Sequence, residues 1–299
     1  MSSEFGFVSS TSTTRLAYGA WLAVCLLWGT TYLGIRIALE TIPPMLMGGF
    51  RWTAAGALIL AVMKLRGDAI PDRAEWPALS LLGLLLIGFG NGGVVWAEQT
   101  LPSGLTAVLV AVIPFWMIGV ELLTGNAAPL TPRRALGLVI GFGGIVLLVW
   151  PELELGEGAA FLLGVLATQL ACLGWAIGSS YSRRRRPAEN VLAVAAFQML
   201  FGGLAMLAGG LLHGEWPALS FNARTGSALG YLLVFGSLAG FSAYAFALKH
   251  LPLATVSLYA YVNPVIAMVL GTLVLGEPLS PRLAAAGAVV LVGMGMVRR

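Results

Sequence analysis

Long apolar runs alternate with short polar joints along almost the whole chain. A membrane-spanning helix needs about 20 mostly apolar residues, because the hydrocarbon core of a bilayer is about 30 Å thick. The joints carry helix breakers, such as TIPP at 41–44 and LPSG at 101–104. The pattern predicts ten spans, at residues 16–37, 43–63, 76–98, 104–123, 134–150, 158–180, 190–212, 226–248, 253–275 and 282–297.

Composition supports a membrane protein. The 299 residues are 58% hydrophobic and 10% charged, with a mean hydropathy of +0.89. A soluble domain carries about 25% charged residues. Residues 1–15 are expected to be a disordered N-terminus, and the run at 16–37 is too long for a signal peptide. The fold class that follows is an all-α, multi-pass membrane protein with ten transmembrane helices.

Charge placement predicts the orientation. If the N-terminus is cytoplasmic, the cytoplasmic joints hold 13 of the 17 Lys and Arg residues, and the acidic loop PELELGEG at 151–158 lies on the other side. The positive-inside rule therefore places both termini in the cytoplasm. The SRRRR run at 182–186 could instead bind nucleic acid or anionic lipid, but a loop that sets topology is the favoured interpretation. We expect no nucleic-acid partner.

The chain contains an internal repeat. The matching segments keep their order and nearly constant spacing, and each half holds five predicted spans. Because five is odd, the second half must enter the membrane upside down, which gives two inverted repeats at 16–150 and 158–299. The aligned pairs are CLLWGTTYLGIR at 25–36 with CLGWAIGSSYSR at 172–183, LPSGLTAVLVAVIPF at 101–115 with LPLATVSLYAYVNPV at 251–265, and LTPR at 130–133 with LSPR at 279–282.

Several of these segments resemble the drug/metabolite transporter superfamily, in its ten-helix EamA-type branch. They are WGTTYLGIR in the first span, PPMLMGGFRW at the start of the second, the LP-x11-P spacing of the fourth and ninth, and LGEPLSPR before the tenth. The resemblance covers residues 16–297 and implies export of small metabolites across the bacterial inner membrane. Some members export aromatic or neutral amino acids. The first span has no carboxylate, unlike the small multidrug exporters, so proton antiport by that route is not expected.

Candidate substrate contacts are the aromatic and uncharged polar residues that lie deep in the predicted spans. Small-molecule pockets have apolar walls with a few placed polar groups. Packing in the core or against lipid is the alternative for each aromatic residue. The candidates are Trp28, Tyr32, Asn91, Trp116, Gln169, Trp175, Tyr244, Tyr259 and Asn263.

Three ionisable residues and two prolines are further candidates. Arg51 lies well inside the second span, with Glu98 or Glu40 as its expected partner, and Glu98 or Glu121 could carry a proton. A structural ion pair or an arginine that reaches the membrane surface is the alternative. Pro114 and Pro264 are expected hinges, because proline interrupts helical hydrogen bonds.

Other function classes find little support. A membrane enzyme needs a convergent set of catalytic groups or a metal site, and the sequence offers neither; no cofactor is expected. A channel needs a more continuous polar lining. Gly137 and Gly141 could pack within the monomer or form a weak dimer. We therefore expect an exporter that works by alternating access, facilitative for amino acids, with proton-coupled efflux as the alternative.

Overall fold

A computed structural model describes residues 11–125, 131–154, 158–185 and 190–298, which are helical apart from the joints, with no strand among them. The all-α prediction is confirmed. Residues 11–15, expected to be disordered, already belong to the first helix, while residues 1–10 lie outside the described part. The first half contains α1 (Thr11–Ala38), α2 (Pro44–Arg66), η1 (Arg73–Glu75), α3 (Trp76–Gly83), η2 (Leu84–Asn91), α4 (Gly92–Ala97), α5 (Ser103–Val110), α6 (Ile113–Leu123) and α7 (Pro132–Glu154).

The second half follows a similar order. Its elements are α8 (Gly158–Arg184), α9 (Val191–Leu212), η3 (Trp216–Ala218), α10 (Ala223–Tyr231), η4 (Leu232–Ala239), α11 (Gly240–His250), α12 (Leu253–Val256), α13 (Tyr259–Leu275) and α14 (Pro281–Arg298). Seven helical segments among the described residues are long and apolar enough to cross a membrane, and Tyr259–Leu275 and Pro281–Gly293 are shorter apolar helices. A multi-pass membrane protein follows from these lengths.

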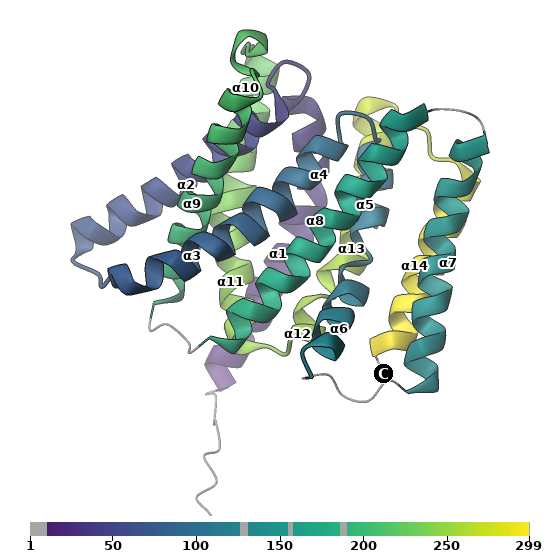
Figure 1. The fold of residues 1–299 in the computed structure, drawn as a ribbon, viewed down its shortest axis with the longest axis horizontal. Helices are drawn as coiled ribbons and strands as arrows, with labels where there is room; N and C mark the ends of the chain where they lie inside the picture. The colour runs from purple at the N-terminus through teal and green to yellow at the C-terminus, as the bar shows by residue number, and fades with distance from the viewer. Residues whose placement is uncertain (1–10, 126–130, 155–157, 186–189, 299) are drawn as a thin grey trace, which may run out of the picture.

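Helices from different halves pack in pairs. α2 runs along α9, and α7 runs along α14 at the right edge of Figure 1. Glycines permit both contacts: a Cβ at Gly293 would collide with the backbone of Gly141 and with the Gly137 carbonyl. The glycine pair predicted at 137 and 141 therefore packs within the chain, as small residues do in membrane helices.

Four segments near the centre depart from regular α-helix. η2 and η4 are π-helical turns, each set between two α-helices. The α5–α6 segment breaks at 111–112, and the α12–α13 segment breaks at 257–258. Backbone groups released by such breaks need protein partners inside a membrane. η2 and the residues beside the α5–α6 break line the pocket described below, and η4 packs against α1 and α2.

A substitution at the α2–α9 contact is expected to destabilise the protein. The added Cβ of Gly56→Ala would lie 2.6 Å from the Ala196 carbonyl oxygen and 2.6 Å from the Leu200 backbone nitrogen. Backbone atoms of α9 cannot move aside without separating the helices, so we expect a loss of about 1–3 kcal/mol. The measurement is the midpoint of thermal unfolding in detergent.

The matched control is Gly209→Ala on α9, where an added Cβ meets nothing within 4 Å. Both changes replace a helical glycine by alanine, so their intrinsic helix preferences are alike. Equal unfolding midpoints for the two variants would contradict the close approach of α2 and α9.

Candidate functional site

A small pocket lies at the centre of the bundle, where α1, α2, α8 and α13 meet η2 and the α5–α6 break. Its volume is about 60 Å³, which is several times the roughly 10–15 Å³ that one water molecule needs. Six of the predicted contact residues line it, together with Arg51. These six are Trp28, Tyr32, Asn91, Trp175, Tyr259 and Asn263.

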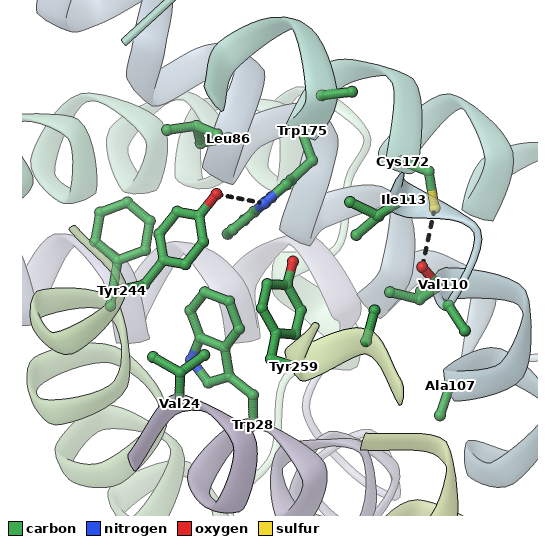
Figure 2. Packing of buried hydrophobic residues seen from close by; sticks show 14 of the residues in the cluster. Val24, Trp28, Leu86, Ala107, Val110, Ile113, Cys172, Trp175, Tyr244 and Tyr259 are labelled. Atoms are coloured by element: carbon green, nitrogen blue, oxygen red, sulfur yellow. Dashed lines mark hydrogen bonds between the residues drawn. The ribbon is translucent and has the colours of Figure 1, made fainter. Parts of the chain in front are cut away.

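One side of the pocket is closed by an aromatic cluster of Trp28, Trp175, Tyr244 and Tyr259, whose rings face one another in Figure 2. The Trp28 ring centroid lies 5.4 Å from Trp175, 5.0 Å from Tyr244 and 5.2 Å from Tyr259. All four side chains are at most 9% exposed. Each such ring pair contributes about 0.5–1.5 kcal/mol of interaction energy beyond the burial of apolar area. These contacts hold the four rings together at this side of the pocket.

Hydrogen bonds fix the cluster in place. The Trp175 Nε1–H donates to the Tyr244 hydroxyl at 3.1 Å, and Ser179 Oγ lies 2.8 Å from the same hydroxyl (Figure 2 shows the first of these). The Trp28 Nε1–H donates to the Gly236 carbonyl in η4 at 3.1 Å. The indole fits there because residue 240 is glycine: a Cβ would lie 2.5 Å from Trp28 Nε1. The π-helix η4 thus supplies the acceptor, and the first residue of α11 supplies the space.

A second cavity, of about 570 Å³, lies on the other side of the cluster. It opens among α3, α8, α9 and α11, at the end of the bundle called here the basic end, because Arg183, Arg185 and Lys249 line it. Tyr244 also lines this cavity, whereas Trp28, Trp175 and Tyr259 line the central pocket. The aromatic cluster therefore separates the two spaces.

Arg51 is the charged residue of the central pocket. It is 2% exposed, its Nε–H donates to Ser237 Oγ at 2.7 Å, and its guanidinium lies 4.5 Å from the centroid of the Trp52 ring. Its Nη1 has no hydrogen-bond partner among the described residues. Arg51 and Trp52 are neighbours on α2, and the sequence reasoning missed Trp52 and Ser237, since neither stands out in an apolar run.

The expected ion pairs of Arg51 are not formed. Within the described parts of the chain, no carboxylate oxygen lies within 4.0 Å of its guanidinium, and Glu40 pairs instead with Arg224 at 3.0 Å. Depth in the membrane had suggested these partners, but depth does not fix which face of a helix a residue occupies. Arg51 faces η4 and finds a serine there.

The two candidate proton carriers differ in their surroundings. Glu98 follows α4 and is fully buried, and neither carboxylate oxygen has a hydrogen-bond partner in the described residues. Arg36 instead donates to the backbone carbonyl of Glu98. Glu121 lies near the end of α6, half-buried and outside the central pocket. Of the two, Glu98 has the environment that disfavours a charged carboxylate.

Trp116 and Gln169 lie beside the α5–α6 break, outside the pocket lining. The Trp116 Nε1–H donates to Gln169 Oε1 at 3.1 Å, and Gln169 Nε2 donates to the Leu109 carbonyl at 3.5 Å. Cys172 Sγ lies 3.9 Å from the carbonyl of Val110 (Figure 2). The side chains of Gln169 and Cys172 thus approach the carbonyls at the end of α5. Trp116 and Gln169, both predicted as substrate contacts, hydrogen-bond to each other in this structure.

The two prolines occupy different places relative to the breaks. Pro114 is in the first turn of α6, and Pro264 is inside α13. The neighbouring Asn263, with its amide oriented to suit its partners, donates to the Cys25 carbonyl at 2.9 Å and to the Tyr259 carbonyl at 3.1 Å. Asn263 therefore lines the pocket and also joins α13 to α1.

Two carboxylates close the opposite end of the bundle, called here the far end, where α2 and α5 begin. Glu215 accepts hydrogen bonds from the backbone nitrogens of Met45 at 3.2 Å and Leu46 at 2.9 Å, in the first turn of α2. Glu277 accepts from the Ser103 nitrogen at 3.0 Å and from Ser103 Oγ at 2.7 Å, where α5 begins. Negative charge at a helix N-terminus is stabilising, and each contact joins the second half to the first.

Comparisons with known proteins agree with this architecture. The EamA-like transporter family matches residues 15–150 and 162–299. An uncharacterized inner membrane transporter of Escherichia coli K12, YedA, is 36% identical over 266 residues, which cover 88% of this chain and 84% of YedA. An uncharacterized transporter of Bacillus subtilis, YoaV, is 23% identical over 92% of this chain and 94% of its own.

A solved crystal structure shares the fold. It superposes with a TM-score of 0.69 at 21% sequence identity and covers 97% of this chain and 98% of that one. A likeness at this level of identity concerns the fold alone.

Proposed function

The chain belongs to the EamA-like transporter family, and on that premise we propose that it exports small amphiphilic metabolites across the bacterial inner membrane by alternating access. The observation that supports this proposal most directly is a small central pocket, which is lined by a buried cation and separated by aromatic rings from a larger cavity. Amino acids with aromatic or neutral side chains suit such walls and are the leading substrates. Membership of this family makes the protein a transporter rather than an enzyme.

The proposed machine consists of two inverted five-helix repeats, residues 16–150 and 158–299, that together form ten spans. The pairing of α2 with α9 and of α7 with α14 supports this arrangement. The placement of a π-helix in the third segment of each half, and of a break in the fourth, also supports it. Inverted repeats place substrate sites near the midplane of the membrane and between the halves, and the pocket is lined by residues of both halves. The chain contacts itself through its small-residue faces, which favours a monomer.

The two ends of the bundle differ as expected for a state that is open to the cytoplasm and closed to the periplasm. Carboxylates of the second half cap helices of the first at the far end, whereas α9 begins at the basic end with its own Asn190 as cap. With both termini cytoplasmic, the basic end faces the cytoplasm. In this arrangement the molecule is closed toward the periplasm, and substrate enters the large cavity and waits at the aromatic cluster.

Pro114 and Pro264 are proposed as hinges of the exchange between states. Pro→Ala restores an N–H that can bond to the carbonyl four residues earlier, across the break for Pro114 and within α13 for Pro264, which stiffens each helix. Each variant is expected to slow counterflow in proteoliposomes about tenfold, equivalent to ~1.4 kcal/mol of barrier. The control is Pro77→Ala in the exposed first turn of α3. Unchanged rates in both hinge variants would make the prolines simple packing features.

Transport is proposed to be facilitative, and proton coupling is the second candidate because Glu98 is buried without a hydrogen-bonded partner. A facilitative carrier equilibrates radiolabelled amino acid in proteoliposomes without accumulation when a pH gradient is imposed. Accumulation driven by the gradient, and abolished by Glu98→Gln, would instead establish coupled antiport through that residue. The absence of saturable flux across a wide panel of amino acids would reject the export proposal.

A further inference from the structure

The side chain of Arg51 is incompletely satisfied inside a closed bundle. One nitrogen is bonded to Ser237, the plane lies beside Trp52, and Nη1 lines the pocket region without a partner among the described residues. Arginine stays charged in proteins, and an uncompensated buried charge carries a large desolvation cost. The pocket therefore lacks an anion.

Among the described residues no carboxylate contacts Arg51 in this conformation, and buried Glu98 acts on it only from a longer distance. None of the residues that line the pocket in the structure is an aspartate or glutamate, and no carboxylate of the described chain lies within 4.0 Å of the guanidinium. The nearby oxygen of Asn91 already has a partner, because Asn91 Oδ1 accepts a hydrogen bond from Trp52 Nε1 at 2.7 Å. The position next to Nη1 is therefore open to an anionic group of a bound ligand.

The size of the pocket indicates which part of a molecule fits. Its volume, about 60 Å³ against about 570 Å³ for the larger cavity, gives room for a small polar group such as a carboxylate. The remainder of a larger ligand would lie where Trp28, Trp175 and Tyr259 now meet. An apolar or aromatic body would replace ring contacts with ring contacts as the cluster opens.

The larger cavity, through which a ligand would reach the pocket, is also lined mainly by positively charged residues. Arg183, Arg185 and Lys249 line the larger cavity, against one acidic residue, Glu75. Cavities lined by one sign of charge concentrate ions of the opposite sign. Approach and binding thus both favour an anion.

We propose that Arg51 anchors a carboxylate of the transported molecule, whose apolar body lies against the aromatic cluster. The planar fork of arginine matches a carboxylate with two parallel hydrogen bonds. An amino acid and a simple organic acid share this group. The inference rests on the proposed transport function and adds a substrate class and the residue that selects it.

Four probes of similar shape test the anchor by calorimetric binding in detergent: L-phenylalanine, L-phenylalaninamide, 3-phenylpropionate and 2-phenylethylamine. Only probes with a carboxylate are expected to bind. Arg51→Gln should weaken their binding about 10- to 100-fold, as loss of a charged hydrogen bond does. Arg66→Gln, on the exposed last turn of the same helix, should leave binding unchanged. Binding of phenylalanine alone would identify an amino-acid carrier, and binding of phenylpropionate would identify a carrier of organic acids.

Folding and function are tested separately. Arg51→Gln removes an uncompensated charge, so its unfolding temperature should not fall below that of the native protein; a purely structural arginine predicts a fall. Arg51→Lys keeps the positive charge but loses the planar guanidinium group, so it should also weaken binding of the two probes that carry a carboxylate.

Equal binding of amide and acid, or full binding by either Arg51 variant, would overturn the anchor. If phenylalanine uptake into proteoliposomes persists in that case, the transport function stands without it. If native protein neither binds nor transports any probe, both proposals fail.

Discussion

A guanidinium buried in a mostly apolar bundle is the constraint on which the centre of this structure depends. Arg51 is 98% removed from solvent by residues of several segments, with a serine of η4 on one nitrogen and a tryptophan ring against its plane. Such a charge is tolerated in a membrane only where it faces the interior and marks function. The small pocket, the aromatic cluster and the larger cavity are all arranged around it.

Irregular helices make that centre possible. The π-helix η4 brings Ser237 to Arg51 and the Gly236 carbonyl to Trp28. The break before Pro114 exposes carbonyls that Gln169 and Cys172 approach. Because hydrocarbon offers no water to satisfy such groups, these departures from α-helix can occur only inside protein. They are therefore concentrated where two halves of the chain meet.

The sequence predicted an all-helical, multi-pass membrane protein, because apolar runs of this length form helices and the breakers between them form joints. It also selected Trp28, Trp175 and Tyr259, since large aromatic residues far from span ends are unusual. The sequence did not show that Trp116 and Gln169 hydrogen-bond to each other, because the direction of the Trp116 side chain depends on the helix break at 111–112. Nor could it find Ser237, whose neighbours in η4 follow a π-helical rather than α-helical phase; the matching LLLIGFGN at 84–91 and LLVFGSLA at 232–239 were the available signal.

The two ends of the bundle differ in how they are closed. Glu215 and Glu277 close one end across the halves, while the other holds a basic cavity that stops at the aromatic cluster. An experimental structure with a transported carboxylate bound is the most direct test. The account predicts a carboxylate oxygen about 2.7–3.2 Å from Arg51 Nη1, with the rings of Trp28 and Tyr244 moved apart. Arg51 paired with Glu98, and the ligand bound elsewhere, would contradict it.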